Sequence, residues 1–295
     1  ISPKTRVAVV QGNIDQAVKW DPAFQIDTVK KYNRLSASIS KQQPDLIVWP
    51  ESATPFYFLY DIKPTELVFE GIRQTSADYL IGSPSFTQSG AVVRYFNSAY
   101  LISPLTKHMS KYDKTHLVPF GEYVPLKKWL PFLGKIVAQV GDFKAGREGQ
   151  TLLWKTEQVG VQICYEIIFP RLSRAMAKND ASLLINITND AWFGKTSGPY
   201  QHFSMTVFRA VENRRALVRS ANTGISGFID PAGRVLASTP LLQDAALVRS
   251  IPLMKTKTLY TRIGDLFAQV CFAAALIVVL LEISKFALRL KHGRR

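Results

Sequence analysis

Three side chains in this sequence are of types that together could carry out nucleophilic catalysis: a cysteine, a glutamate and a lysine. Cys164 follows the apolar run VGVQI, Glu51 follows LIVWP, and Lys114 lies in YDKTHLVPFGEYVP. A cysteine is a strong nucleophile only as a thiolate, so it needs a base to accept its proton or a cation beside it. A carboxylate can act as that base, and an ammonium can also stabilise the oxyanion of a tetrahedral intermediate.

Each of these residues, taken alone, also has a structural interpretation. A lone cysteine is commonly a buried core residue, an acid after a strand is commonly solvated, and a lysine in a polar run is commonly surface charge. Glu51 and Cys164 both lie just past the end of a buried strand, where a side chain can protrude. Residue types alone leave both interpretations open.

The elements that must position these residues follow an alternating pattern. Short apolar runs of strand length are separated by segments with apolar residues at helical spacing. The pattern predicts an α/β layered fold in one domain. The predicted strands are 6–10, 46–49, 79–81, 97–102, 159–164, 183–188, 225–229 and 235–238, and the predicted helices are 28–40, 65–76, 170–178 and 200–216.

Composition narrows the class of protein. The chain has 295 residues and a net charge of +15, and with 47% hydrophobic and 20% charged residues it is not a disordered chain. Only two cysteines are present, Cys164 and Cys271, so a disulfide framework and a four-cysteine zinc site are excluded. The histidines lack metal-ligand spacing and no nucleotide motif is found, so we expect no metal and no cofactor. The charge by itself fits nucleic acid, an anionic membrane or an acidic substrate.

The most apolar segment lies near the C-terminus, where residues 266–281 contain one polar residue, Gln269. Extended to 263–283, it would form a helix of about 31 Å, against about 30 Å for the hydrocarbon core of a bilayer. A buried helix of a soluble protein is the alternative, but this segment is apolar all round. We predict a catalytic domain at 1–255, a linker at 256–262, a transmembrane helix at 263–284 and a basic tail at 285–295.

The tail gives the predicted helix a direction. It carries Lys285, Arg289, Lys291, Arg294 and Arg295 and no acid, and such clusters mark the cytoplasmic side of a span. We therefore expect the preceding residues on the opposite side of the membrane. Because the sequence begins directly with a strand and no export segment, we expect further membrane segments before it. With the charge explained in this way, nucleic acid is not an expected partner.

Three segments carry a resemblance. WPES at 49–52, YDKTHLVPFGE at 112–122 and ICYE at 163–166 look like the signature segments of the nitrilase superfamily, whose members use a Glu-Lys-Cys triad. Glu51, Lys114 and Cys164 occupy the matching positions in the matching order. Further similarity in NITNDAWFG and RAVENRRALVRSANTGISGFIDPAGRV extends the resemblance over about residues 6–250. The resemblance implies an αββα sandwich of two stacked sheets, followed here by one transmembrane helix.

Within this superfamily the chain resembles one branch in particular. Soluble amidases of the superfamily usually have Asp where this chain has Glu166, and they lack a terminal span. The segments VVQGNIDQAVKWDP, HLVPFGEYVP, CYEIIFP, NDAWFG and QHFSMTVFRAVENRR are similar to the apolipoprotein N-acyltransferases, which complete bacterial lipoprotein maturation. The resemblance implies the bacterial inner membrane, with the catalytic domain in the periplasm. It also implies that this chain matches the C-terminal portion of such an enzyme.

The resemblance implies a ping-pong reaction. Glu51 would take the thiol proton, and Cys164 would attack the sn-1 ester of a phospholipid such as phosphatidylethanolamine. Lys114 and the backbone N–H of Tyr165 would stabilise the oxyanion, and a thioester would remain. The α-amine of the N-terminal diacylglyceryl-cysteine of an apolipoprotein would then take the acyl group.

Several further residues are expected to support the site. Glu122 would orient Lys114 and Glu166 would support the cysteine loop, with ordinary salt bridges as the alternative. The segment 124–137 mixes lysines with apolar residues, which favours a lipid-facing lid over core packing. The expected substrate-binding residues, for which core packing is again the alternative, are Trp129 and Phe132 in this segment and Trp20, Trp192 and Phe193 outside it. We expect a monomer.

Two other classes of function stay open. In a membrane-tethered nitrilase-type amidohydrolase, water rather than an amine would resolve the acyl-enzyme. Glu166 and the terminal span argue against it. The other class is a non-catalytic lipid- or nucleic-acid-binding module, and only the positive charge supports it.

Overall fold

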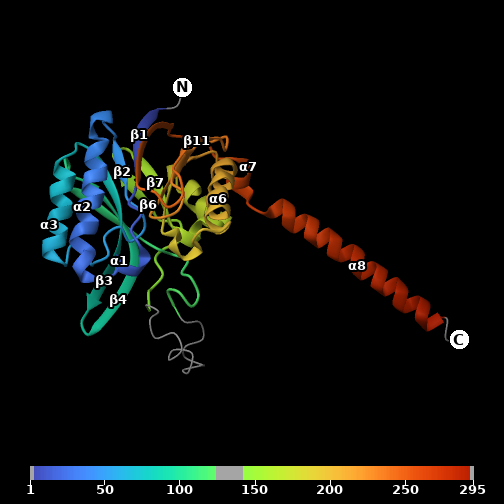
Figure 1. The fold of residues 1–295 in the computed structure, drawn as a ribbon. Helices are drawn as coiled ribbons and strands as arrows, with labels where there is room; N and C mark the ends of the chain where they lie inside the picture. The colour runs from blue at the N-terminus through green and yellow to red at the C-terminus, as the bar shows by residue number, and fades with distance from the viewer. Residues whose placement is uncertain (1–2, 124–141, 293–295) are drawn as a thin grey trace.

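The computed structural model describes residues 3–123 and 142–292, with the backbone alone from residue 286. Over this part of the chain two six-stranded sheets form, and they face each other across a shared core. Helices cover the outer face of each sheet (Figure 1). The predicted αββα sandwich is therefore confirmed.

The two sheets have matching topologies. In each, three neighbouring strands run parallel and the outer strands pair antiparallel. The first sheet has the order β12 (Ala245–Pro252), β1 (Lys4–Gln11), β2 (Leu46–Val48), β3 (Asp78–Ser89), β4 (Val92–Ser103) and β5 (His108–Asp113). The second has the order β11 (Val235–Ser238), β10 (Gly227–Ile229), β9 (Ala216–Ala221), β8 (Ala181–Thr188), β7 (Glu157–Ile163) and β6 (Thr151–Trp154).

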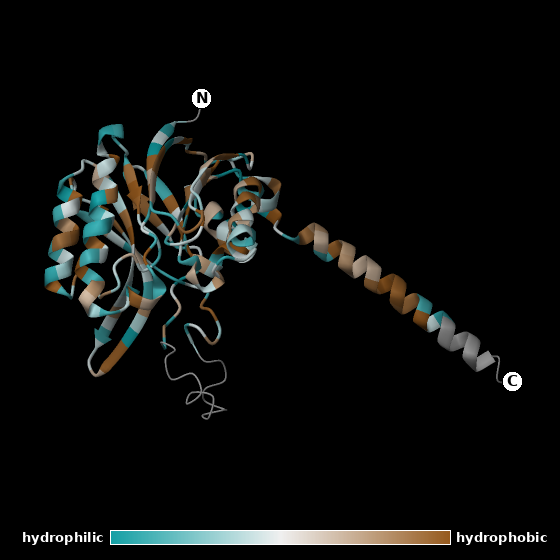
Figure 2. Cartoon of the chain, viewed as in Figure 1, coloured by the Kyte–Doolittle hydropathy of each residue, from teal (hydrophilic) through white to brown (hydrophobic). Residues whose placement is uncertain are grey.

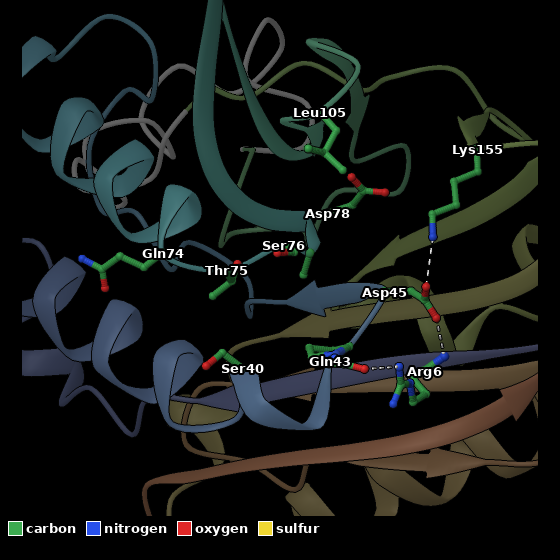
Figure 3. Close-up of a pocket in the computed structure, with 12 residues that line it drawn as sticks. Arg6, Ser40, Gln43, Asp45, Gln74, Thr75, Ser76, Asp78, Leu105 and Lys155 are labelled. Atoms are coloured by element: carbon green, nitrogen blue, oxygen red, sulfur yellow. Dashed lines mark hydrogen bonds and ion pairs between the residues drawn. The ribbon is translucent and has the colours of Figure 1, made fainter.

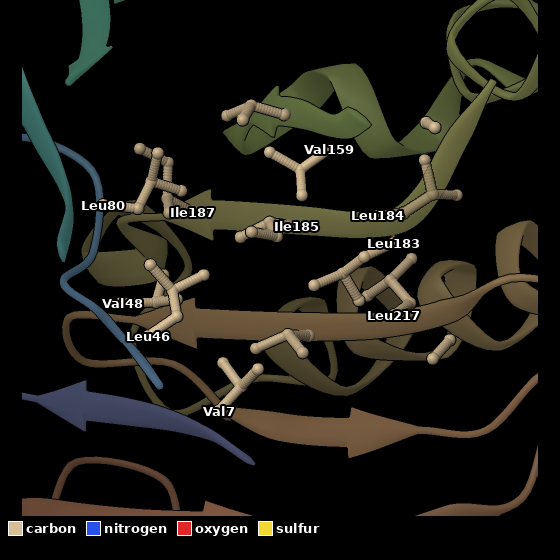
Figure 4. Packing of buried hydrophobic residues seen from close by; sticks show 14 of the residues in the cluster. Val7, Leu46, Val48, Leu80, Val159, Leu183, Leu184, Ile185, Ile187 and Leu217 are labelled. Carbon is tan, nitrogen blue, oxygen red and sulfur yellow. The ribbon is translucent and has the colours of Figure 1, made fainter. Parts of the chain in front are cut away.

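The core between the sheets explains why the central strands are continuous apolar runs. Parallel strands in a layered fold are buried on both faces, so they need apolar residues at every position. Leu46, Val48 and Leu80 of the first sheet pack towards Ile185 and Ile187 of the second (Figure 4). This packing fixes the two sheets against each other, and with them the residues at the strand ends.

Helices close the outer faces. On the first sheet, α2 (Pro22–Ser38) and α3 (Ile62–Arg73) pack side by side, preceded by the short α1 (Gln16–Lys19) and with η1 (Ser40–Gln42) after α2. On the second sheet lie α5 (Pro170–Lys178) and α6 (Gly198–Asn213). Two short 3₁₀ helices follow strands of this sheet directly: η2 (Cys164–Ile168) after β7 and η3 (Asp190–Phe193) after β8.

The structure corrects several predicted elements. The sequence pattern missed β5, β6 and β12, which are outer strands with polar or exposed residues. It also extended the last helix of the domain to residue 216, whereas α6 ends at Asn213 because Arg214 adopts a left-handed conformation. The next residues form the buried strand β9, whose Arg219 hides the apolar pattern. Finally, Cys164 begins η2 rather than ending a strand.

The C-terminal segment consists of two helices. Residues Leu259–Ile263 form α7, which Thr258 caps and which packs against α5 and α6, and all of its residues but Ile263 fall in the range 256–262 predicted as a linker. Gly264, with φ of +65°, separates α7 from α8 (Leu266–His292), so the apolar helix begins three residues later than predicted. Its residues Leu266–Lys285 are long and apolar enough to cross a membrane, and none of that stretch is buried. Figure 1 shows α8 extending away from the sandwich, and Figure 2 colours many residues in its coloured part as hydrophobic.

Candidate active site

Glu51 lies in the turn that follows β2. This turn crosses β3 at Gly82, where a Cβ atom would collide with the backbone of residues 50–52, so glycine is required for the close approach. The carboxylate is largely buried and accepts hydrogen bonds from Asn97 Nδ2 at 2.8 Å and from the backbone N–H of Asn189 at 2.9 Å. Since Asn189 follows β8, the second sheet also holds Glu51 in place.

Lys114 directly follows β5 and its side chain is 1% exposed. Its Nζ lies 2.9 Å from Glu122 Oε1 and 3.7 Å from Glu51 Oε1. Asn97 bridges the same two carboxylates, because its Nδ2 also donates to Glu122 Oε1 at 2.8 Å. Burial alone would lower the pKa of Lys114, but Glu51, Cys164 and Glu122 raise it above its usual range. The ammonium is therefore fixed and permanently charged.

Cys164 occupies the junction between β7 and η2. Its φ is +52°, a sparsely populated conformation for a residue with a side chain, and the residue is partly buried. Burial and the nearby Glu51 raise the pKa of the thiol to about 12, against the opposing effect of Lys114. At neutral pH the thiol is thus protonated, and it would need a base to react.

Glu166 ties the cysteine turn to the lysine loop. Its fully buried carboxylate accepts hydrogen bonds from the N–H of Ile163 at 2.7 Å, of Thr115 at 2.7 Å and of His116 at 2.9 Å. The hydroxyl of Tyr112 donates to it as well, at 3.0 Å. Burial raises the pKa of Glu166, while the N–H donors lower it. Because the donors lie on both sides of Lys114 and include Ile163, the residue before Cys164, Glu166 fixes these two segments relative to each other.

Lys19 is a buried cation that the sequence pattern did not reveal. It ends α1, its Nζ donates to the carbonyl oxygen of Glu51 at 3.1 Å, and its side chain is 1% exposed. Burial lowers its pKa to about 8, although Glu51 and Cys164 act in the opposite direction. The one signal in the sequence was its place in KWDP, next to Trp20. The sequence analysis also did not identify Asn97. No local pattern marks it, because its contacts with Glu51 and Glu122 depend on its position along β4.

The residues expected to bind substrate fall into two groups. Trp20, Trp192 and Phe193 are 49%, 82% and 40% exposed, so they are not core residues. The ring of Phe193 packs edge-on against His202. Trp129 and Phe132, with the rest of 124–137, lie outside the described residues. Tyr165 is partly buried, and its ring contacts Phe169.

A pocket of about 370 Å³ lies at the opposite edge of the first sheet (Figure 3). It surrounds Asp45 and Asp78, at the beginnings of β2 and β3, whereas Glu51 follows the end of β2. The carboxylate of Asp45 accepts a hydrogen bond from Lys155 Nζ at 3.0 Å and another from the backbone N–H of Arg6 at 2.9 Å. Since this pocket lacks the Glu, Lys and Cys described above, it is a surface recess apart from the candidate site.

The combined geometry provides the parts of an acyl-transfer site. A protonated thiol, a carboxylate and a fixed ammonium lie at the ends of strands from two sheets, with a second carboxylate holding the ammonium. A carboxylate can remove the thiol proton, and an ammonium can stabilise an oxyanion.

The chain is similar to curated proteins over most of its length. The chain is 49% identical to an apolipoprotein N-acyltransferase of Geobacter metallireducens over 94% of its own length and 53% of the relative's. It is 34% identical to the Chlorobaculum tepidum protein of the same name, over 95% and 57% of the two lengths. The chain thus spans about half the length of the curated relatives it matches.

Solved structures support the same fold. An amidase from Nesterenkonia sp. superposes with a TM-score of 0.62 at 20% identity, covering 91% of this chain and 96% of the amidase. Nit3 of Saccharomyces cerevisiae, a nitrilase superfamily member, superposes with a TM-score of 0.63 at 18% identity, covering 84% and 90%. The family model for carbon–nitrogen hydrolases matches residues 6–260, and the chain therefore belongs to the carbon–nitrogen hydrolase family.

Proposed function

We propose that this chain is the catalytic part of an apolipoprotein N-acyltransferase, with Glu51, Lys114 and Cys164 as its triad. The observation that carries the chemistry is the buried arrangement in which Lys114 contacts Glu51 and Glu122 and acts electrostatically on the Cys164 thiol. The substrates rest on the relatives, which are named apolipoprotein N-acyltransferases and are up to 49% identical in the comparison above.

The first half-reaction transfers an acyl group from lipid to enzyme. Glu51 accepts the thiol proton, and the thiolate of Cys164 attacks the sn-1 ester carbonyl of a phospholipid such as phosphatidylethanolamine. Lys114 and the N–H of Tyr165 stabilise the oxyanion. When the intermediate collapses, the departing lysophospholipid oxygen takes the proton from Glu51, and the acyl group stays on sulfur as a thioester.

The second half-reaction transfers the acyl group to protein. The α-amine of an N-terminal diacylglyceryl-cysteine attacks the thioester, and the same oxyanion donors act again. Glu51 takes a proton from the attacking amine and returns it to the leaving thiolate. The products are an amide and the free thiol, so the site is restored without any cofactor.

The location follows from the same proposal. In it, α8 crosses the bacterial inner membrane, the basic tail from residue 285 lies in the cytoplasm, and the monomeric catalytic domain faces the periplasm. The apolar, unburied surface of α8 and the lysines and arginines that follow it support this arrangement. Trp20, Trp192 and Phe193 would then be available to lipid.

The test supplies both substrates to the natural full-length protein in membranes. With phosphatidylethanolamine labelled in its sn-1 chain, the label should appear on Cys164 and move to a diacylglyceryl lipopeptide when that acceptor is added. Absence of label on Cys164 would reject acyl transfer through this cysteine. A labelled thioester whose lifetime the lipopeptide leaves unchanged would instead support an amidohydrolase-type reaction with water.

A further inference from the structure

The peptide group between Cys164 and Tyr165 is held by buried polar side chains that the proposed reaction does not use. Nε2 of His202 lies 3.2 Å from the carbonyl oxygen of Cys164, and Nδ2 of Asn186 lies 3.5 Å from the same atom. His202 comes from α6, which packs against η2, and it is 6% exposed. A side chain from another element therefore holds the backbone of the candidate nucleophile.

The second ring nitrogen of His202, Nδ1, also has buried polar partners. Nδ1 of His202 lies 2.8 Å from Asp190 Oδ1 and 3.0 Å from Arg219 Nη2. Arg219 also donates to Asp190 Oδ2 at 2.8 Å, and both residues are buried. Burial and Arg219 lower the pKa of His202, while Asp190 raises it.

The contacts determine which ring nitrogen carries the proton. A carbonyl oxygen can only accept a hydrogen bond, so Nε2 of His202 must be the donor to Cys164. In the neutral ring Nδ1 then accepts from Arg219 and makes no hydrogen bond to Asp190, and in the charged ring it donates to Asp190. Both protonation states leave the bond to the Cys164 carbonyl intact, so the anchor does not depend on the charge of the ring.

Fixing this carbonyl also fixes a donor on the opposite side of the peptide. The peptide group is planar and trans, so the Cys164 C=O and the Tyr165 N–H point in opposite directions. Tyr165 lies in the first turn of η2, where N–H groups have no acceptor within the helix. The strained φ of +52° at Cys164 means that this orientation has to be held by its surroundings.

We propose that His202, itself held by Asp190 and Arg219, is a positioning residue that aims the Tyr165 N–H at the oxyanion in both half-reactions. This inference rests on the proposed acyl transfer. It adds no chemical step of its own, because His202 contacts the backbone and not the substrate.

The experiment compares two substitutions of His202 in the natural full-length protein in membranes. Every protein in the comparison also carries Cys271→Ser, which removes the second cysteine of this sequence. In His202→Gln the amide nitrogen can occupy the position of Nε2, whereas in His202→Asn the shorter side chain stops near Nδ1. Two rates are measured at Cys164: acylation by a labelled phospholipid, and alkylation by iodoacetamide. Alkylation passes through no oxyanion, so it reports the thiol alone.

We expect His202→Asn to lower the acylation rate at saturating lipid at least about tenfold, with little change in KM, because a misaligned oxyanion donor acts mainly in the transition state. Its alkylation rate should stay within about twofold, and His202→Gln should keep acylation within about threefold of the parent. His108→Gln, on an exposed residue of β5, is the matched control and should change neither rate.

Three outcomes would overturn the inference. Equal losses in Asn and Gln variants would show that the hydrogen bond is not the cause. A parallel loss of alkylation would place the effect on the thiol rather than on the peptide group, and unchanged acylation in His202→Asn would remove the role altogether. Failure of the proposed function is distinguishable, because the parent protein itself would then carry no acyl label.

Discussion

The two sheets contribute to the candidate site in different ways. The first sheet and its loops supply charge: Lys114 contacts both Glu51 and Glu122, and Asn97 donates to the same two carboxylates. The second sheet supplies Cys164, whose backbone is held by His202 and Asn186 in a left-handed turn. One half therefore provides the ionisable groups, and the other fixes the direction of a nucleophile.

The difference teaches that neither half suffices alone. The N–H of Asn189 in the second sheet reaches Glu51 in the first, and Glu166 of the second sheet accepts from Thr115 and His116 beside Lys114. These contacts join segments that are far apart in the chain, so the site exists only once the apolar core has joined the sheets. Substitutions on the first-sheet side should therefore affect activity and stability differently from substitutions on the second-sheet side.

The largest effect is expected on the nucleophile side. Cys164→Ser should lower acyl transfer by about 10⁴-fold or more, because a serine hydroxyl is far less acidic than a thiol and is the weaker nucleophile even beside the same base. Transfer of labelled acyl chain to a lipopeptide measures this loss, and thermal unfolding checks that the fold is kept. Cys271→Ser is the control and should retain activity. Substantial activity in Cys164→Ser would assign the nucleophile elsewhere.

On the charged side, Lys114→Met should damage both activity and stability. It leaves two buried carboxylates without their cation, which costs about 3–5 kcal/mol in the free energy of unfolding. Activity should fall by about 10²–10³-fold through the lost oxyanion stabilisation. Denaturant unfolding and acyl transfer measure the two effects.

Lys111→Met is the matched control for this substitution, because Lys111 forms a partly exposed pair with Asp113. Such pairs contribute about 0–1 kcal/mol. Equal loss of stability in the Lys114 and Lys111 variants would contradict the claim that Lys114 stabilises two buried carboxylates.

The sequence predicts the central strands except β9, and it predicts the triad, but it predicts less of what surrounds them. Strands with both faces buried, such as β2 and β8, are recognisable as apolar runs, and Glu51, Lys114 and Cys164 follow from three signature segments. Outer strands such as β5 lack that pattern because one face is exposed. Asn97 and Lys19 reach Glu51 across 46 and 32 positions of the chain, so their roles depend on register and packing that no local pattern encodes.

Lys19→Met should separate function from stability. The pKa of Lys19 falls from the ordinary 10.5 to about 8, so between these values the unfolded chain holds a proton that the folded chain lacks. The wild-type free energy of unfolding should therefore rise with pH across this window, and below it the buried charge costs about 3 kcal/mol. The variant should be more stable at pH 7, by about 2 kcal/mol once the lost hydrogen bond to Glu51 is counted.

The same variant should be about tenfold less active, because the Glu51 turn loses its donor and can shift. Unfolding measured at pH 7 and pH 10 and acyl transfer at pH 7 check both effects. If the stability difference between wild type and variant did not shrink as the pH rises, Lys19 would not carry a buried charge.

The smallest effect is expected at the exposed rim of the second sheet. Trp192 is 82% exposed, so Trp192→Ala should change the free energy of unfolding by no more than about 0.5 kcal/mol. If the indole contacts lipid, the apparent KM for phospholipid should rise a few-fold with kcat unchanged. A loss of kcat without a change in KM would argue for a role in the chemistry rather than in binding.

The central claim is that Glu51 of the first sheet activates Cys164 of the second, and the time course of Cys164 acylation tests it most directly. Full-length protein and its Glu51→Gln variant are mixed with phospholipid, quenched in acid and analysed by mass spectrometry of the Cys164 peptide. The account predicts rapid formation of a hydroxylamine-sensitive acyl adduct in the wild type and a rate lower by about 10²–10⁴-fold in the variant. Equal rates in the two proteins, or an adduct on another residue, would contradict it.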